Sequence, residues 1–172
     1  MRSKPTLYYF VGFPGAGKTT AANHIHELTG AVHLWADKER QKLYPVPTHS
    51  ESESRELYSK LNALTEQLLE QGESVIFDTN FNHKADRDLM RAIAEKHHAE
   101  AKLIWLTTPI ETAKTRALHN AHRDRNGYLV VMSEDEFNSL SSKLEPVEES
   151  EQPIRIDGSD NTLNELKLKL GL

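Results

Sequence analysis

Nine residues near the amino terminus have the types and spacing of a phosphate-binding loop. The pattern G-x-x-x-x-G-K-[ST] is met by Gly12, Phe13, Pro14, Gly15, Ala16, Gly17, Lys18 and Thr19, with Thr20 following. Glycines permit backbone conformations that a Cβ atom forbids, so successive N–H groups can turn inward around phosphate oxygens. Lys18 would then reach the β- and γ-phosphates of a nucleotide, and the Thr19 hydroxyl would bind Mg²⁺.

The predicted elements on either side of this loop are those that such a loop requires. Residues 7–11 form a short apolar, aromatic and β-branched run, which predicts a buried strand that ends at the loop. From residue 18 to 28 apolar side chains recur at helical spacing, and Gly30 stands where a helix would end. The positive end of this helix would point at the same phosphates. The alternative is a Gly-rich turn between two elements.

Two carboxylates follow the next two predicted strands, where an open parallel sheet binds its ligands. Asp78 ends the apolar run 74–77 and would interact with a Mg²⁺ held by Thr19, either as a ligand or through another ligand of the ion. Asp37 follows the strand 31–36, and a carboxylate there can orient an acceptor hydroxyl and take its proton. Arg40 would lie on the same helical side and hold an anionic part of the substrate. The alternatives are caps for the two acids and a solvated Arg40.

A further set of candidates lies on a predicted helix over residues 110–122. Arg116, Asn120 and Arg123 recur at i, i+4 and i+7, and Arg125 follows. Arginines brought in by a mobile segment stabilise the charge on a transferring phosphoryl group, and such a segment also excludes water. We therefore predict a lid at about residues 116–132, with catalytic roles for Arg116 and Arg123. A solvated charged face is the alternative.

The nine histidines do not add a convincing metal site. His119 and His122 are at i, i+3, and His97 and His98 are adjacent, but neither pair has a third ligand at a suitable spacing. Adjacent residues also do not face one another on a helix. We interpret the histidines as surface residues.

The rest of the chain alternates predicted strands and helices, which is typical of an α/β structure with a mainly parallel sheet. Strands are expected over residues 7–11, 31–36, 74–78, 101–107 and 154–157. Helices are expected over residues 18–28, 37–43, 52–71, 84–98 and 110–122, after Ser133 and after Asn161. The predicted core faces of the third and fourth helices comprise Leu57, Leu61, Leu64, Leu68, Leu89, Met90, Ile93 and Ala94. We interpret the acidic run 145–151 as a solvated connection.

Composition limits the class of protein. A chain of 172 residues with 37% hydrophobic and 27% charged residues suits a single globular domain. It has no cysteine, which excludes disulfides and cysteine-bound metals. No apolar run approaches the roughly 18 residues of a membrane span, and residues 1–5 are too few for a signal peptide, so we expect a cytoplasmic protein. The net charge of −5 argues against a broad non-specific grip on nucleic acid, although a local basic patch would still allow binding.

Together these residues resemble small P-loop kinases of the polynucleotide-kinase and zeta-toxin-like type, often labelled AAA-type ATP-binding domains. The resemblance covers nearly the whole chain and rests on the loop followed by Asp37-x-x-Arg40, Asp78-Thr79-Asn80-Phe81 with Arg87, and Thr108-Pro109-x-Glu111-x-Ala113-x-x-Arg116. It implies an α/β P-loop NTPase fold, with a five-stranded parallel sheet of order 2-3-1-4-5, helices on both faces and a lid over ATP. It also implies that Lys18 and Thr19 bind the nucleotide and Mg²⁺, that Asp37 activates the acceptor, that Asp78 is the acid of the third strand, and that Arg116 is the first lid arginine.

The predicted function is that of an ATP- and Mg²⁺-dependent kinase, with residues 1–172 forming one domain. It would transfer the γ-phosphoryl group to a hydroxyl, and the acidic net charge favours a small-molecule acceptor. The alternatives are a kinase for the 5′-hydroxyl end of a nucleic acid and a regulatory protein that uses ATP as a switch. Asp37 discriminates between these classes, because a switch does not need a carboxylate aimed at an acceptor hydroxyl.

Overall fold

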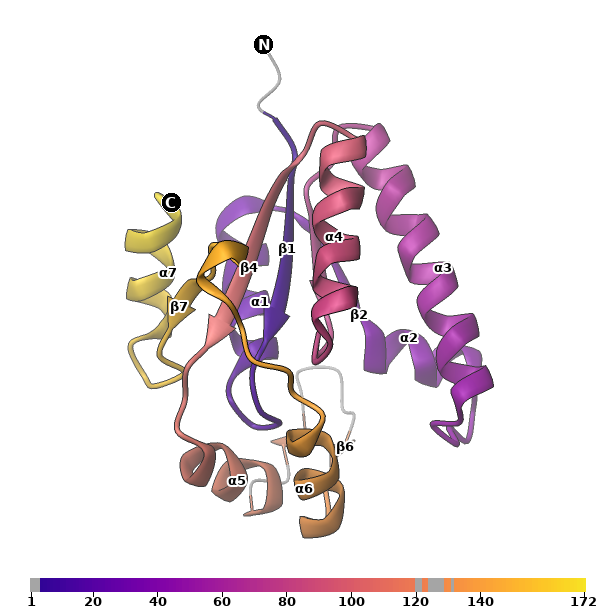
Figure 1. Cartoon of the computed structure of the whole chain (residues 1–172), viewed down its shortest axis with the longest axis vertical. Coiled ribbons are helices and arrows are strands. Elements are labelled where there is room, and N and C mark those ends of the chain that lie inside the picture. Colours follow the sequence, from indigo (N-terminus) through magenta and orange to yellow (C-terminus); the bar gives the residue numbers. More distant parts are fainter. Residues whose placement is uncertain (1–3, 120–121, 124–128, 131) are drawn as a thin grey trace.

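The computed structural model describes residues 4–119, 122–123, 129–130 and 132–172. Its centre is a sheet of five parallel strands in the order β2-β3-β1-β4-β7 (Figure 1). The strands are β1 (Thr6–Val11), β2 (Val32–Trp35), β3 (Val75–Asp78), β4 (Glu100–Leu106) and β7 (Ile154–Ile156). Counted along the chain, this is the order 2-3-1-4-5 that the resemblance implies, and the predicted fold class is confirmed.

Strand β1 is buried on both faces of the sheet. Leu7, Tyr9 and Val11 pack into one apolar cluster, whereas Tyr8 and Phe10 pack into a second cluster. Alternate residues of a strand point to opposite faces. An uninterrupted apolar run is therefore what the middle of a parallel sheet needs, since helices cover it from both sides.

Helices cover the two faces as layers (Figure 1). Helices α3 (Glu51–Glu70) and α4 (Lys84–Lys96) contribute to the first cluster, while α1 (Lys18–Thr29) and α7 (Thr162–Leu170) contribute to the second. The remaining elements are α2 (Ala36–Leu43), α5 (Ile110–His119), the antiparallel pair β5 (His122–Arg123) and β6 (Leu129–Val130), α6 (Glu134–Ser142) and the 3-10 turn η1 (Glu149–Glu151). Figure 1 shows α5 and α6 beyond the carboxyl ends of β1 and β4.

Two of the predicted core faces are partly wrong. The buried stripe of α3 is Leu57, Leu61, Thr65 and Leu69, while Leu64 is 38% exposed. Thr65 can be buried because its hydroxyl donates to the Leu61 carbonyl at 2.8 Å. Leu89 of α4 is also exposed, at 44%. On a helix with many leucines, apolar spacing alone does not decide which side meets the sheet.

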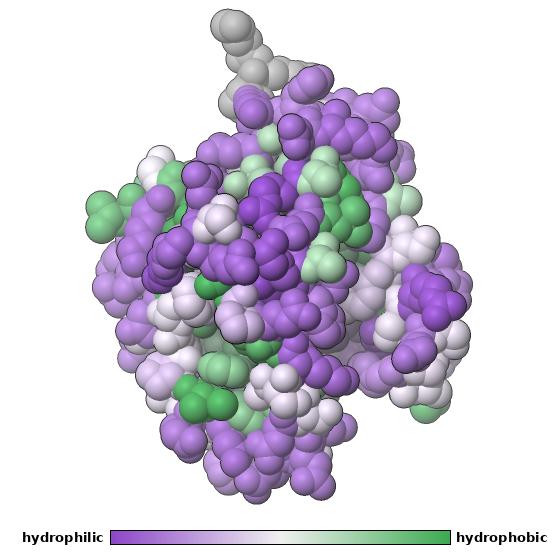
Figure 2. Space-filling model, in the orientation of Figure 1, coloured by the Kyte–Doolittle hydropathy of each residue, from purple (hydrophilic) through white to green (hydrophobic). Residues whose placement is uncertain are grey.

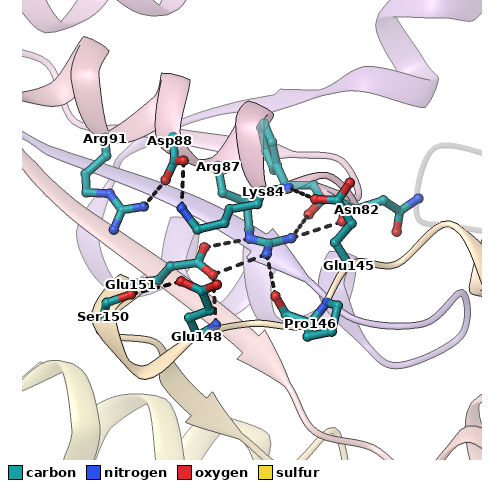
Figure 3. A network of polar contacts seen from close by, with 11 residues as sticks. Asn82, Lys84, Arg87, Asp88, Arg91, Glu145, Pro146, Glu148, Ser150 and Glu151 are labelled. Carbon is teal, nitrogen blue, oxygen red and sulfur yellow. Dashed lines mark hydrogen bonds and ion pairs between the residues drawn. The ribbon is translucent and has the colours of Figure 1, made fainter.

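The acidic connection before β7 is not simply solvated, which corrects the prediction for residues 145–151. Glu151 is 4% exposed and accepts hydrogen bonds from Arg87 Nε at 2.7 Å and Nη2 at 3.2 Å. Arg87 of α4 is fully buried and also donates to the Phe81 carbonyl. It donates further to the carbonyls of Asn82 and Pro146 (Figure 3). Burial raises the pKa of Glu151, but the hydrogen bonds from Arg87 and from the Glu148 N–H, together with the positive charges of Arg87 and Arg91, outweigh this effect and lower the pKa. One guanidinium thus joins the connection after β3 to the connection before β7.

The surface seen in Figure 2 is mostly hydrophilic, with apolar residues in separate places. Among the described residues, the most exposed large apolar side chains are Leu168 of α7 and Val46 between α2 and α3. Within the same residues, no helix combines the length and the apolar character needed to cross a membrane.

Replacing Arg87 with methionine would leave the Glu151 carboxylate buried without its cation. We expect Arg87→Met to lower the free energy of unfolding by about 3–5 kcal/mol, which is the usual cost of removing one partner of a buried ion pair. Chemical denaturation measures the loss. Arg91→Met is the control, because Arg91 pairs with Asp88 nearer the surface, where such pairs contribute about 0–1 kcal/mol. Equal losses in the two variants would contradict the structural role of the Arg87–Glu151 pair.

Candidate active site

The carboxyl ends of β1, β2 and β3 bring the predicted chemical groups to one edge of the sheet. Strand β3 lies between β1, which leads into the phosphate loop, and β2, where Trp35 is paired with Asp78. Thr19 Oγ1 lies 3.4 Å from Asp78 Oδ1 and donates a hydrogen bond to it. The structure thus places the first helical turn after the loop against the acid of the third strand.

The phosphate loop itself needs glycine at two positions for two separate reasons. Gly15 and Gly17 have φ angles of 78° and 104°, which lie in the left-handed region of backbone conformation that residues with a Cβ atom rarely adopt. A Cβ atom on Gly15 would stand 2.2 Å from the Ala113 carbonyl oxygen of α5. Helix α5 therefore packs directly on the backbone of the loop.

Lys18 points back into the loop. Its Nζ donates to the carbonyls of Gly12 at 2.9 Å and Phe13 at 2.8 Å. Burial lowers the pKa of Lys18 to about 8, although the charges of Asp78 and Asp37 act in the opposite direction. A partly buried ammonium that donates to two carbonyls can also bind an anion, and a phosphate at this loop would balance its positive charge.

Asp37 lies in the first turn of α2, not at its cap. The helix begins at Ala36 with Trp35 as the N-cap, so the N-cap alternative for Asp37 is wrong. Water reaches the Asp37 side chain, yet desolvation by the surrounding protein raises its pKa, and the Asp78 charge adds to this effect. A carboxylate with a raised pKa is a better proton acceptor at neutral pH, as a general base requires.

The alternative that Arg40 is a solvated surface residue is wrong. Its side chain is buried, with Nη1 donating to Glu53 Oε1 at 2.6 Å and Nη2 donating to Ser54 Oγ at 3.2 Å. Glu53 and Ser54 belong to α3, so the contact fixes α2 against α3. The predicted contact of Arg40 with an anionic part of the substrate would compete with this ion pair.

Glu53 also fixes the connection between α2 and α3. It accepts hydrogen bonds from the N–H and the hydroxyl of Thr48, both at 2.8 Å, and from the N–H of His49 at 3.3 Å. Burial raises the pKa of Glu53, but the hydrogen bonds from Thr48 and Arg40 outweigh it and hold the pKa at about 2. His49 has a φ of 55°, an uncommon conformation for a residue with a Cβ atom. A single carboxylate therefore holds a strained connection in place beside α2.

Arg116 of α5 is tied to the phosphate loop through Gly158. Its Nη1 donates to the Gly158 carbonyl at 2.6 Å, so Arg116 is not simply solvated. The Gly158 N–H donates to Thr108 Oγ1 at 3.1 Å, and the Thr108 hydroxyl donates to the Ala16 carbonyl at 2.8 Å. This chain of hydrogen bonds joins α5, the connection after β7 and the loop.

The other lid arginines lie outside what the structure describes. The backbone of Arg123 belongs to β5, but its side chain is outside the described residues, as is the whole of Arg125. Within the predicted lid at residues 116–132, the structure shows the end of α5 and the antiparallel pair β5–β6. The catalytic role of Arg123 stays a prediction.

Sequence reasoning missed His33 of β2. Its Nε2 lies 2.9 Å from Asp78 Oδ2, and its side chain is only 15% exposed, so the surface interpretation is wrong for this histidine. The same interpretation is wrong for His97, whose side chain is 13% exposed and lies against Glu66. A weak signal was present, because His33 stands two residues before the end of its strand and such residues share a face of the sheet. Only the strand order shows that β3, which carries Asp78, is the neighbour of β2 in the sheet.

A family model described as an AAA domain matches residues 7–149. The chain belongs to this family. The fold is similar to that of the Mycobacterium tuberculosis APS kinase CysC in complex with AMPPNP and APS, with a TM-score of 0.70, 17% identity and coverage of 98% of this chain and 99% of that chain.

Two further solved structures show the same fold. A sugar kinase from Janibacter sp. HTCC2649 matches with a TM-score of 0.67 and 19% identity over 98% of this chain and 93% of that chain. A chain of the Pnkp1/Rnl/Hen1 RNA repair complex matches with a TM-score of 0.67 and 20% identity over 84% of this chain and 45% of that chain. A comparison with curated proteins finds no match. The family and the P-loop NTPase fold that the sequence predicted are therefore confirmed.

The low pKa of Glu53 can be tested by varying the pH. Its folded pKa of about 2 lies below the ordinary value of 4.5, so its contribution to stability is present above pH 4.5 and is lost as the pH falls toward 2. We expect Glu53→Gln to be less stable than the unsubstituted protein at pH 7 and to lose less stability between pH 7 and pH 2.5. Urea midpoints across this range measure both effects. Glu70→Gln, at an exposed position of the same helix, should keep the original pH dependence; the same dependence in Glu53→Gln would refute the assignment.

Gly158 generates a second test. A Cβ atom there would stand 1.9 Å from the Ala16 carbonyl oxygen and 2.2 Å from Thr108 Oγ1. We expect Gly158→Ala to displace the loop, to cost about 1–3 kcal/mol of stability and to weaken nucleotide binding at least about tenfold, or 1.4 kcal/mol. Gly30→Ala is the control, since its Cβ would meet nothing within 4 Å and its cost is left-handed strain of about 1–2 kcal/mol. The nucleotide affinity, measured by calorimetry, should be unchanged in Gly30→Ala. An unchanged affinity in Gly158→Ala would contradict the proposed dependence of the phosphate loop on Gly158.

Proposed function

We propose that this protein is an ATP- and Mg²⁺-dependent kinase that transfers the γ-phosphoryl group to a hydroxyl of a small molecule. The observation that carries the proposal is the position of Asp37 beside the phosphate loop. Its carboxylate lies close enough to Lys18 and Asp78 that the Asp78 charge adds to the raising of the Asp37 pKa by desolvation, while the charge of Asp37 counteracts the lowering of the Lys18 pKa by burial. A protein that only binds ATP as a switch has no need for this additional accessible carboxylate.

The proposed roles follow from the chemistry of phosphoryl transfer. Backbone N–H groups within residues 12–20, where Pro14 alone has none to donate, and the Lys18 ammonium bind the β- and γ-phosphates. As the acceptor oxygen bonds to the γ-phosphorus, the bond from that phosphorus to the β–γ bridging oxygen breaks, and the hydroxyl proton passes to Asp37. Arg116 and Arg123 of the proposed lid stabilise the charge on the transferring group. Arg116 would have to leave the Gly158 carbonyl to do so.

The Thr19 hydroxyl and the Asp78 carboxylate fit Mg²⁺. Both are oxygen donors and lie 3.4 Å apart, and Mg²⁺ keeps several waters, so one or two protein oxygens together with phosphate oxygens suffice. When bound, the ion would neutralise charge on the β- and γ-phosphates. The cap alternative for Asp78 has less support, because its two oxygens bond to the side chains of Thr19 and His33.

Charge favours a small acceptor over a nucleic-acid end. The chain carries a net charge of −5, and Arg40, the first arginine after Asp37, is balanced by Glu53. A 5′-hydroxyl nucleic-acid acceptor is the second candidate, which the similarity to a chain of an RNA repair complex supports. Strong salt dependence of acceptor binding would favour this second candidate.

The proposal is tested by phosphoryl transfer from γ-labelled ATP with Mg²⁺ to sugars, nucleosides, aminoglycosides and 5′-hydroxyl oligonucleotides. We expect label on a small molecule, and Asp37→Asn should lower the transfer rate by about 10²–10⁴-fold, the usual contribution of a general base. The affinity for ATP should change little in Asp37→Asn, because the carboxylate acts on the acceptor. Lys18→Ala should instead weaken binding of the nucleotide.

Asp86→Asn is the matched control, since Asp86 is an exposed aspartate in the first turn of a different helix, α4. Its transfer rate should equal that of the unsubstituted protein. Full transfer activity in Asp37→Asn would remove Asp37 from the mechanism. Unaltered nucleotide binding and transfer in Lys18→Ala would overturn the phosphate-loop assignment itself.

A further inference from the structure

We propose that His33 is a positioning residue that holds the metal-binding carboxylate Asp78 in place, an inference that rests on the Mg²⁺·ATP site proposed above. The contact joins two neighbouring strands, with His33 Nε2 at 2.9 Å from Asp78 Oδ2. An ionised carboxylate can only accept hydrogen bonds, so Nε2 carries the proton and donates. His33 does not touch the nucleotide site directly; it acts through Asp78.

The two oxygens of Asp78 are held by two different elements. Oδ2 faces His33 of β2, and Oδ1 faces the Thr19 hydroxyl at the start of α1. Asp78 is only 3% exposed, so little solvent is available to replace a lost partner. Without His33, Oδ2 would be a buried acceptor with no side-chain donor in the part of the chain that the structure describes, and the carboxylate would be free to turn away from Thr19.

His33 is itself fixed in position by the sheet and by α1. Its pairing partner in β3 is Ile76, and Trp35 pairs with Asp78, so His33 and Asp78 share one face of the sheet. The ring centroid of His26 in α1 lies 6.4 Å from that of His33. His26 is bound elsewhere, since its Nδ1 donates to the Ala31 carbonyl at 2.8 Å. Of these two neighbouring histidines, His33 contacts Asp78 and His26 contacts the Ala31 carbonyl instead.

This difference supplies matched variants. Met and Gln are of similar size and flexibility, but only Gln can donate a hydrogen bond. His33→Met removes the donor, His33→Gln restores one, and His26→Met perturbs the neighbouring ring without touching Asp78. The measured quantity is the gain in affinity for AMPPNP when Mg²⁺ replaces EDTA, determined by calorimetry.

We expect this Mg²⁺-dependent gain to fall by about 10–100-fold in His33→Met, the range typical of residues that orient a metal ligand. His33→Gln should recover much of the gain, and His26→Met should show the full gain. An equal gain in His33→Met and the unsubstituted protein would overturn the proposal. A loss of thermal stability in both His33 variants with an undiminished gain would also overturn it, because it would show a structural role only.

The unsubstituted protein provides a second measurement that does not depend on the variants folding. Addition of Mg²⁺ to the AMPPNP complex should shift the imidazole ¹⁵N resonances of His33. His97 is the internal reference, because its Nε2 also lies 2.9 Å from a carboxylate, Glu66 of α3, away from the loop. An unchanged His33 resonance would overturn the inference. Absence of any Mg²⁺-dependent gain in the unsubstituted protein would instead show that the proposed cofactor fails, and this inference with it.

Discussion

The close approach of three backbones at the phosphate loop is the constraint on which the rest of the site depends. The Ala113 carbonyl oxygen lies only 2.2 Å from the position that a Cβ atom of Gly15 would take, and the Ala16 carbonyl oxygen only 1.9 Å from that of a Cβ atom of Gly158. The loop is therefore held between α5 and the connection after β7, with Thr108 bonded to both Ala16 and Gly158. Lys18 keeps its orientation because the two carbonyls that accept its hydrogen bonds belong to the backbone of this loop.

Carboxylates near the site have opposite behaviour for physical reasons that are visible in their partners. Glu53 is buried, yet the hydrogen bonds from Thr48 and Arg40 lower its pKa. At Asp37, desolvation together with the Asp78 charge raises the pKa against the opposing positive charges of Arg40, His49 and Lys18. The first carboxylate stabilises the structure by staying ionised, whereas the second is suited to take a proton. The same type of side chain thus supports the fold at one position and the proposed chemistry at the other.

Much of the fold could be predicted because local patterns and global architecture agree. The apolar run of β1, the glycine-rich loop and the helix after it occur in the expected order, and the alternation of strands and helices led to the parallel sheet. The predictions failed where they had to say which side of an element is buried. Leu64 and Leu89 fit an apolar stripe but are exposed, and Glu151 lies in an acidic run but is buried. Side-chain spacing does not show which neighbour an element will meet.

The sequence by itself determined the phosphate loop, because the glycines and Lys18 act through a local backbone conformation that needs no distant partner. It also determined that Asp37 and Asp78 follow strands, which brings them to one edge of a parallel sheet. Only the tertiary structure decided that Arg40 is bound by Glu53, that Gly158 packs on the loop and that His33 holds Asp78. These contacts join residues 13, about 140 and 45 positions apart, and they depend on strand order and register, which local sequence patterns do not encode.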